Sequence, residues 1–275
     1  MFRRMNIQGM SNISDSEFAQ FQRFIYDAAG ITLSASKKAL VSGRLAKRLQ
    51  HCRLDSYAEY FRLLTQGDAA EEVQTAVDLL TTNETYFFRE SKHFDFLRGQ
   101  ALQARKQTQM FRVWSAASSS GEEAYSMAMV LADCLANAPW EVIGSDISAR
   151  VLQRASAGHY PIERAKNIPA DYLRRFCLKG IDEQDGTLLV ERGLRSRVHF
   201  KQVNLNSSLP ELGTFDVIFL RNVMIYFSND TKRQVVARVL SMLKPGGHLC
   251  VGHSESLNDI TSEVQQLAPS IYHRK

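Results

Sequence analysis

Residues 110–123 of the chain read M-F-R-V-W-S-A-A-S-S-S-G-E-E, and this stretch decides the fold class. Its apolar first half predicts a short strand over 110–116, and the small residues that follow predict a tight turn. Apolar residues then recur every four positions over 121–136, which predicts a helix that begins at Gly121. A strand, a tight turn of small residues and a helix start let the backbone approach a ligand closely.

The alternation of strand and helix patterns continues toward the C-terminus. Further strands are predicted over 141–147, 198–203, 215–220 and 248–252, and helices over 148–157 and 230–243. The run F-D-V-I-F-L at 215–220 is apolar enough for burial on both faces of a sheet, and K-P-G-G at 244–247 predicts a turn. Such alternation predicts an α/β fold with a parallel sheet and right-handed crossovers, in which ligands bind beyond the carboxyl ends of the strands.

The first 80 residues contain helix patterns and no strand pattern. They predict a small all-helical domain over 12–80, ahead of the α/β domain at 81–275. Ser14 and Glu17 have the spacing of a capping box, and apolar residues follow them at helical spacing. Three more helices are predicted, over about 36–50, around 57–64 and from a start at Asp68 onward.

One stretch interrupts the alternation in the second domain. It contains Gly180, then Asp185 and Gly186, and a β-rich run over 187–190. Asp-Gly between extended runs is a hairpin signal. We therefore predict a small β insertion at about 172–200, ahead of the third strand.

Composition excludes several classes of protein. The chain has 275 residues, of which 44% are hydrophobic and 23% charged, as in ordinary globular proteins. Its 34 Lys and Arg against 29 Asp and Glu give a net charge of +5, too small to imply nucleic acid by itself. The four cysteines are far apart and the histidines lack metal-ligand spacing, so neither metal nor disulfides are expected. With no apolar run near the ~18 residues of a membrane span and no export signal, we expect a cytoplasmic protein.

Acidic residues stand at two of the predicted strand ends. A dinucleotide-binding fingerprint requires three glycines, and the turn after the first strand contains one of them, Gly121. Glu122 and Glu123, which follow it, would repel a pyrophosphate. A ligand with hydroxyls or an ammonium group fits better, although an ordinary turn explains the same residues. Asp146 ends the second strand, where nucleotide-binding folds hold ribose hydroxyls, but Asp146 or Ser148 fits the N-cap of the next helix equally well.

Two further segments carry polar groups near the predicted ligand edge. The strand at 215–220 runs into Arg221 and Asn222, and Tyr226 follows, either as a phenol at the site or as part of an aromatic pair under the sheet. Residues 81–90, T-T-N-E-T-Y-F-F-R-E, join the two domains and place hydrogen-bonding groups beside aromatic rings. These residues are consistent either with a segment that contributes to a ligand site or with an interdomain hinge.

A run of basic residues lies in the second predicted helix, with no acid between Asp27 and Asp55. Its members are Lys37, Lys38, Arg44, Lys47 and Arg48. At ~100° per residue, Lys37, Arg44 and Arg48 fall within about 40° of one another on one stripe of the helix. Such a stripe fits an acidic partner or a solvated helix face.

Five stretches then occur in a characteristic order. They are T-T-N-E-T-Y-F-F-R-E (81–90), V-W-S-A-A-S-S-S-G-E-E (113–123), S-D-I (145–147), F-D-V-I-F-L-R-N-V-M-I-Y-F (215–227), and L-K-P-G-G with G-H-S-E-S (243–256). Together they resemble the CheR family, the chemotaxis-receptor glutamate O-methyltransferases, over nearly the whole chain. The resemblance implies a Rossmann-like S-adenosylmethionine-dependent methyltransferase domain behind the helical domain. It implies S-adenosylmethionine as cofactor, S-adenosylhomocysteine as product and receptor glutamates as substrate.

The resemblance also implies roles for individual residues. Cofactor contacts are implied for Asn83, Thr85, Arg89, Glu123, Asp146, Asn204, Leu205, Arg221 and Asn222. Arg89 and Tyr226 are implied as active-site residues. A glutamate carboxylate, with a reference pKa of about 4.3, is ionised at neutral pH and needs no general base. The enzyme then has to hold a carboxylate oxygen in line with the methyl group, for which Arg89 supplies paired N–H donors and Tyr226 a phenol.

The expected partner is the cytoplasmic helical region of methyl-accepting chemotaxis receptors. Receptor methylation sites lie on acidic helices, so charge complementarity assigns the run Lys37, Lys38, Arg44, Lys47 and Arg48 to receptor binding. We expect a monomer that binds no nucleic acid.

Two alternatives stay open. One is a nucleic-acid methyltransferase, which the pI of about 9.0 favours although no N-P-P-[YF]-type segment follows the fourth strand. The other is a non-catalytic receptor adaptor with a damaged cofactor site.

Overall fold

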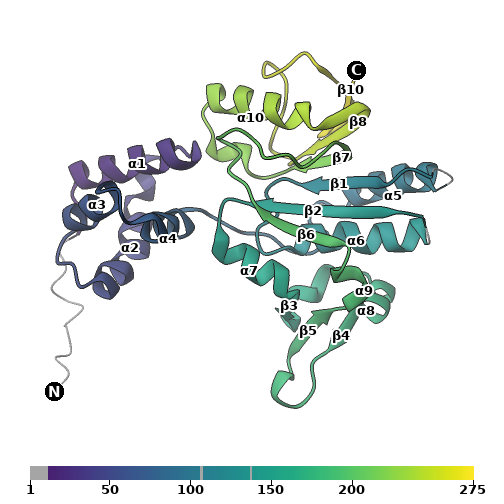
Figure 1. Ribbon diagram of the computed structural model, residues 1–275, viewed down its shortest axis with the longest axis horizontal. Helices are drawn as coiled ribbons and strands as arrows, with labels where there is room; N and C mark the ends of the chain where they lie inside the picture. The colour runs from purple at the N-terminus through teal and green to yellow at the C-terminus, as the bar shows by residue number, and fades with distance from the viewer. Residues whose placement is uncertain (1–11, 106–107, 137) are drawn as a thin grey trace. The chain divides into compact units, whose positions relative to one another are not determined.

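The computed structural model describes residues 12–105, 108–136 and 138–275, which belong to two compact units divided between Thr82 and Asn83. The first unit is helical, and the second is built on a seven-stranded sheet (Figure 1). No helix within the described ranges combines the length and the apolar character that crossing a membrane requires.

Four α-helices make up the described part of the first unit. They are α1 (Asp15–Ala29), α2 (Lys38–Cys52), α3 (Tyr57–Thr65) and α4 (Ala70–Leu80), with a 3-10 turn, η2 (Ala35–Lys37), before α2. The predicted capping box is confirmed, because the Ser14 hydroxyl accepts from the Glu17 N–H and the Glu17 carboxylate accepts from the Ser14 N–H. The prediction for α4 was wrong at its start, since Ala69 and not Asp68 holds the N-cap position.

The core of the first unit forms around the buried Phe21. Its ring centroid lies 5.7 Å from that of Phe61 and 6.2 Å from that of Tyr60, so aromatic packing joins α1 to α3. One face of α2 adds buried side chains to the unit, namely Val41, Leu45 and Leu49. The basic residues of α2 therefore lie on its other faces.

The main sheet of the second unit has the strand order β6-β2-β1-β7-β8-β10-β9 (Figure 1). The strands are β1 (Phe111–Ser115), β2 (Trp140–Asp146), β6 (Val198–Gln202), β7 (Phe215–Leu220), β8 (Leu243–Val251), β9 (Val264–Ala268) and β10 (Ile271–Arg274). The first five strands in this order pair in parallel, as predicted, and β10 and β9 are antiparallel additions. Parallel pairing brings the carboxyl ends of β6, β2, β1, β7 and β8 to one edge of the sheet.

Two features of this sheet differ from the prediction. Residues 244–247 were expected as a turn but lie inside β8, where the pairing with β7 is irregular between Phe215 and Val217. Gly246 has a φ of 75° there, which a residue without a Cβ adopts without strain. The other difference is the β10–β9 edge, which the sequence did not predict. The residues of β9 are mostly exposed, so this strand lacks the apolar run of a strand buried on both faces.

Helices cover the sheet. They are α5 (Lys92–Ala104), α6 (Glu122–Leu135), α7 (Ala149–Ala157) and α10 (Asn229–Ser241), with a 3-10 turn, η5 (Met224–Tyr226), before α10. On one face, Phe94 of α5 and Met127 of α6 share a buried cluster with Val113 and Phe219 of the strands. Helix α7 contacts β2 and β6, and α10 contacts β8.

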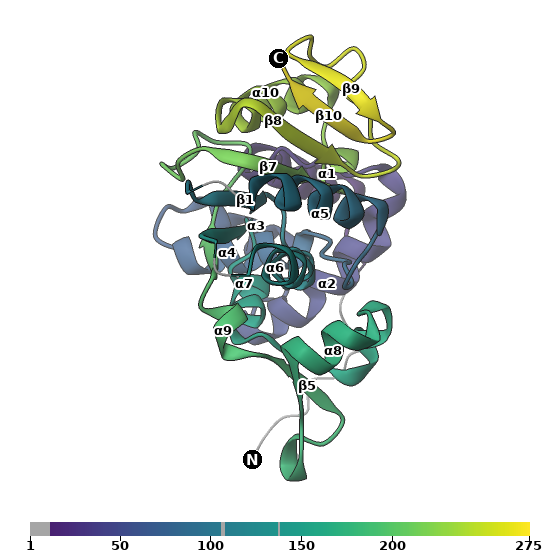
Figure 2. The same cartoon turned by 90° about the vertical axis from the view of Figure 1, so that its right-hand side faces the viewer.

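A separate antiparallel sheet of strand order β3-β5-β4 follows α7. Its elements are β3 (His159–Pro161), η3 (Ile162–Asn167), α8 (Ala170–Phe176), β4 (Cys177–Lys179), η4 (Asp182–Gln184), β5 (Thr187–Val190) and α9 (Arg192–Arg195). We expected the insertion to begin at about residue 172, but it begins with β3 at His159. This start was missed because a three-residue strand is too short to show a sequence pattern. In Figure 2, β5 lies at the opposite end of the second unit from β9 and β10.

Candidate active site

A tight loop joins β1 to α6 at the carboxyl edge of the sheet. The Ser118 N–H donates to the Ser145 carbonyl at 2.7 Å, and Gly121 leads into α6 with a φ of 94°. A Cβ atom at Gly121 would lie 2.8 Å from the Ala155 Cβ, so both the backbone conformation and the contact with α7 require glycine. The small residues of this loop therefore let its backbone pack against β2 and α7.

Asp146, at the end of β2, holds two loops in place. Its carboxylate accepts from the Ser119 N–H at 2.9 Å and from the Ser148 N–H at 3.0 Å, and its side chain is largely buried. Ser148, not Asp146, is the N-cap residue of α7, because its hydroxyl accepts from the Val151 N–H at 3.4 Å. Of the two residues predicted as possible caps, Ser148 therefore caps α7.

Residues from two other segments reach the same edge. The Ser119 hydroxyl donates to the Asn83 carbonyl at 2.9 Å, which ties the start of the linker to the loop after β1. Past the end of β6, the Val203 N–H donates to the Asp146 carbonyl at 2.9 Å, so Asn204 and the buried Leu205 follow directly beside the end of β2. The predicted residues Asn83, Asp146, Asn204 and Leu205 are therefore brought together at one edge of the sheet.

The Arg221 guanidinium lies between two carboxylates. It donates to the Glu123 Oε2 at 2.8 Å and to the Glu90 Oε2 at 2.9 Å, and its side chain is 0% exposed. Rings of two phenylalanines flank it, with centroids 5.7 Å (Phe94) and 5.5 Å (Phe219) from its central carbon. We predicted a cofactor contact for Arg221. Because protein groups surround its side chain, its influence on a ligand passes through Glu90 and Glu123.

The three charged groups leave one net negative charge when both carboxylates are ionised. Burial raises the pKa of Glu123 above its usual value, because Arg221 and the 2.7 Å hydrogen bond from the Ser115 hydroxyl offset only part of the desolvation. Burial also acts on Glu90, but the positive charge of Arg221 and the hydrogen bonds to Glu90 outweigh it and lower its pKa. Glu123 is therefore the carboxylate whose negative charge the protein compensates least.

Linker residues 83–89, which precede Glu90, belong to the second unit. Phe87 is fully buried and packs on Tyr160 with ring centroids 5.1 Å apart, and the Phe88 N–H donates to the Ser126 hydroxyl at 3.0 Å. Arg89 is partly exposed and folds back over its own segment, where it donates to the Glu84 carbonyl at 3.0 Å. Its guanidinium carbon lies 5.7 Å from the ring centroid of Tyr86. Thr85, in the same segment, is partly buried.

The loop after β7 holds Asn222 and Tyr226. Asn222 has a left-handed φ of 56°, and its side-chain amide donates to the Glu90 Oε1 at 3.2 Å. Tyr226 is partly buried at the end of the turn η5. Through Asn222 and Arg221, Glu90 connects the linker that holds Arg89 with the loop that holds Tyr226.

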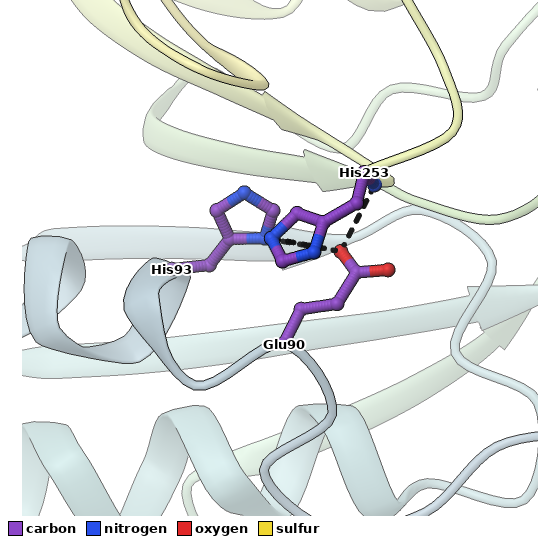
Figure 3. Close-up of side chains that lie close together, drawn as sticks. All are labelled: Glu90, His93 and His253. Atoms are coloured by element: carbon purple, nitrogen blue, oxygen red, sulfur yellow. Dashed lines mark hydrogen bonds and ion pairs between the residues drawn. The ribbon is translucent and has the colours of Figure 1, made fainter.

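Glu90 also meets two histidines (Figure 3). The His93 Nδ1 and the His253 Nε2 lie 3.5 Å and 3.9 Å from the Glu90 Oε2, and the His253 N–H donates to that oxygen at 3.2 Å. Burial, together with the positive charge of Arg221, lowers the pKa of His93 to about 4, so its ring is neutral at pH 7. These residue types bind metals, but a cation at this oxygen would lie beside the buried guanidinium of Arg221. The arrangement instead ties the linker to the end of β8.

The basic residues of the first unit have partners that the sequence did not reveal. Lys38 lies 2.7 Å from the Asp15 carboxylate, and Arg48 makes two hydrogen bonds to the Glu72 carboxylate, which lowers the pKa of Glu72. Arg44 donates to the Thr81 carbonyl at 2.9 Å. The expectation that no acid balances this run was therefore wrong, because α1 and α4 bring acids to α2. Lys37 and Lys47 remain exposed.

Sequence reasoning missed Glu90, His93 and Glu255 as parts of this site. Glu90 and Glu255 stand inside quoted motifs, at the ends of T-T-N-E-T-Y-F-F-R-E and G-H-S-E, but their partners lie far away along the chain. Only the fold shows which carboxylates share a guanidinium or accept from distant backbone amides.

Comparisons with known proteins cover nearly the whole chain. Residues 83–272 match the family model described as CheR methyltransferase, SAM binding domain, and residues 16–81 match CheR methyltransferase, all-alpha domain. A chemotaxis protein methyltransferase of Escherichia coli (strain K12) is 39% identical over 263 residues, which cover 94% of this chain and 91% of that protein. Chemotaxis protein methyltransferase 2 of Pseudomonas aeruginosa is 39% identical over 259 residues, covering 93% and 92%. The chain therefore belongs to the CheR methyltransferase family, and its second unit is the family's S-adenosylmethionine-binding domain.

Proposed function

We propose that this protein transfers a methyl group from S-adenosylmethionine to glutamate side chains of chemotaxis receptors, which yields glutamate methyl esters and S-adenosylhomocysteine. The observation that carries the proposal is the carboxyl edge of the sheet, where Asp146 braces the loop after β1 and Arg221 contacts both the Glu123 carboxylate and the backbone carbonyl of Arg89. That edge combines negative charge for a cationic donor with a guanidinium for an anionic acceptor.

The residues at this edge fit the cofactor. When bound, S-adenosylmethionine supplies an electrophilic methyl group on a sulfonium. Its sulfonium and ammonium groups favour the net negative charge of the Glu90–Arg221–Glu123 cluster, and its ribose hydroxyls suit the Asp146 carboxylate. Contacts with the rest of the cofactor are proposed for Asn83, Thr85, Asn204, Leu205 and Asn222.

The acceptor needs orientation more than activation. A receptor glutamate is already ionised at neutral pH, since its reference pKa is about 4.3. Arg89 makes one hydrogen bond to its own segment, to the Glu84 carbonyl, and a guanidinium carries five N–H donors, enough to grip a carboxylate as well. Tyr226 is proposed to orient one of the carboxylate oxygens. Orientation that holds the oxygen in line with the methyl group is worth several powers of ten in rate.

The helical unit is proposed to bind the receptor's acidic cytoplasmic helices, so that the protein acts in the cytoplasm and as a monomer. Lys37, at the end of η2, and Lys47, on α2, are exposed and are the members of the basic run best placed for this contact. Lys38, Arg44 and Arg48 support the same face while they hold partners within the unit.

The direct test is transfer of a tritiated methyl group from S-adenosylmethionine to receptor-containing membranes. We expect label on the receptor that alkali releases, as from a carboxyl ester. Arg89→Ala should reduce the rate on the order of 100-fold and leave the unfolding midpoint unchanged. Arg233→Ala, which removes an exposed arginine of α10, serves as the matched control and should retain full activity. Label on added DNA or RNA, or cofactor binding without any transfer, would contradict the proposal.

A further inference from the structure

Glu255 links the loops that follow β7 and β8. Its carboxylate accepts from three backbone N–H groups: Gly252 at 2.7 Å, Asn222 at 2.8 Å and Ile225 at 3.2 Å. Gly252 and Glu255 belong to the segment after β8, whereas Asn222 and Ile225 belong to the segment after β7 that ends in Tyr226. One side chain thus fixes both ends of the 222–225 stretch to the neighbouring strand end.

The two loops are pressed together where Glu255 joins them. A Cβ atom at Gly252 would lie 2.5 Å from the Asn222 Nδ2 and 2.8 Å from the Glu255 Oε2. Asn222 itself has a left-handed φ of 56°, a conformation that costs a non-glycine residue energy and persists only when its surroundings enforce it. The hydrogen bonds from Asn222 to Glu255 and Glu90 supply that enforcement.

We propose that Glu255 is a positioning residue for methyl transfer, because it sets the loop that presents Tyr226 to the acceptor. This inference rests on the proposed function. A carboxylate suits the task, since it offers acceptor sites to all three N–H groups and needs no proton. A glutamine at this position would place an N–H₂ donor against at least one backbone N–H. An aspartate would be one methylene too short to reach both loops.

The first experiment follows the loop itself. In Glu255→Gln we expect faster amide hydrogen exchange for Gly252, Asn222 and Ile225, with protection elsewhere and the unfolding midpoint retained. Glu263→Gln, an identical change at an exposed position after β8, is the control and should leave the exchange of these amides unchanged. If Glu255→Gln lowers the unfolding midpoint, Glu255→Asp, which keeps the charge, takes its place. Unaltered exchange at the three amides would overturn the proposal whether or not the protein methylates receptors.

The second experiment asks whether Glu255 acts through Tyr226. The ratio kcat/KM for receptor methylation is measured for the wild type, Glu255→Gln, Tyr226→Phe and the double variant. We expect Glu255→Gln to lower kcat/KM on the order of 10- to 100-fold in the wild type and only a few-fold when Tyr226→Phe is already present. An equal factor in both backgrounds would show that Glu255 does not act through Tyr226 and would overturn the proposal. Absence of methylation by the wild type would refute the proposed function, while the exchange result still decides the role of Glu255.

Discussion

The basic face of α2 and the carboxylate-rich edge of the sheet both begin as charge patterns in the sequence, but folding treats them differently. On α2, acids from neighbouring helices neutralise the charges in pairs, as Asp15 does for Lys38 and Glu72 for Arg48. At the sheet edge a single guanidinium, Arg221, is shared between Glu90 and Glu123, so that one negative charge is in excess when both carboxylates are ionised. The sheet edge therefore has two carboxylates for the one guanidinium that neutralises them.

This difference between paired and incompletely compensated charges indicates which charged residues are available to bind a ligand. A charge that folding pairs within the unit contributes to the structure, and a partner gains little from it. A buried charge that folding leaves incompletely compensated costs stability until a ligand of opposite sign arrives. By this criterion we propose Glu123 as part of the cofactor site, and the exposed Lys37 of η2 and Lys47 of α2 as the basic residues that contact a receptor.

The largest expected effect compares the two ion-paired arginines. Arg221→Met leaves two buried carboxylates facing one another and should lower the free energy of unfolding by about 3–5 kcal/mol. Arg48 is 24% exposed, and Arg48→Met leaves a single carboxylate, Glu72, which keeps the hydrogen bond from the Tyr60 hydroxyl, so it should cost about 1 kcal/mol. Urea unfolding followed by circular dichroism measures both.

A second change isolates the cause of the loss at Arg221. Adding Glu90→Gln to Arg221→Met removes one of the two facing charges, so stability should partly recover. The same Glu90→Gln change in the wild type removes one of the two negative charges that are ion-paired with Arg221, so it should lower the free energy of unfolding. Equal costs for Arg221→Met and Arg48→Met would remove the contrast between the two regions.

The next effect concerns pH at the sheet edge. The pKa of His93 is about 4 in the folded protein against about 6.5 in an unfolded chain, so the unfolded state takes up a proton first. Stability from this group is fully present above pH 6.5 and is lost as the pH falls toward 4, by up to about 3 kcal/mol. Unfolding free energies for the wild type and His93→Leu between pH 7 and 4 measure the contribution. Parallel curves for the two proteins would show that His93 does not titrate in this way.

The smallest effect tests the exposed part of the basic face. Lys47→Glu should raise the KM for receptor about three- to tenfold, with a larger ratio at low salt, and leave the affinity for the cofactor unchanged. Arg105→Glu reverses an exposed charge at the end of α5 and is the matched control. If both variants change the KM equally, net charge and not the α2 face attracts the receptor.

Local signals predicted much of the fold. The capping box at Ser14 and Glu17 and the strand Phe215–Leu220 depend on neighbouring residues, and both lie where the sequence places them. The short strand β3 and the exposed edge strand β9 were missed because neither presents an apolar period long enough to recognise. Residues 244–247 look like a turn locally, and although they are part of β8, they fall in the irregular stretch between the pairs Phe215–Leu243 and Val217–His248.

The position of the candidate site could be predicted from the sequence, but the hydrogen bonds and ion pairs within it could not. Parallel strands place Asp146, Arg221 and Asn222 at one edge, and the order of the strands along the chain is enough to expect this. Which group neutralises which depends on contacts between residues far apart in sequence. Glu90 reaches Arg221 and His253 only after the linker folds onto the sheet, so their shared carboxylate has no signature in the sequence.

The excess negative charge at the sheet edge is proposed to hold a cationic methyl donor. Titration calorimetry with S-adenosylmethionine tests it, on the wild type and on Glu123→Gln, which keeps an oxygen for Arg221 but removes the charge. We expect measurable heat and one site for the wild type, and affinity weaker on the order of tenfold for Glu123→Gln. Absence of heat with the wild type, or the same affinity for both proteins, would contradict the claim.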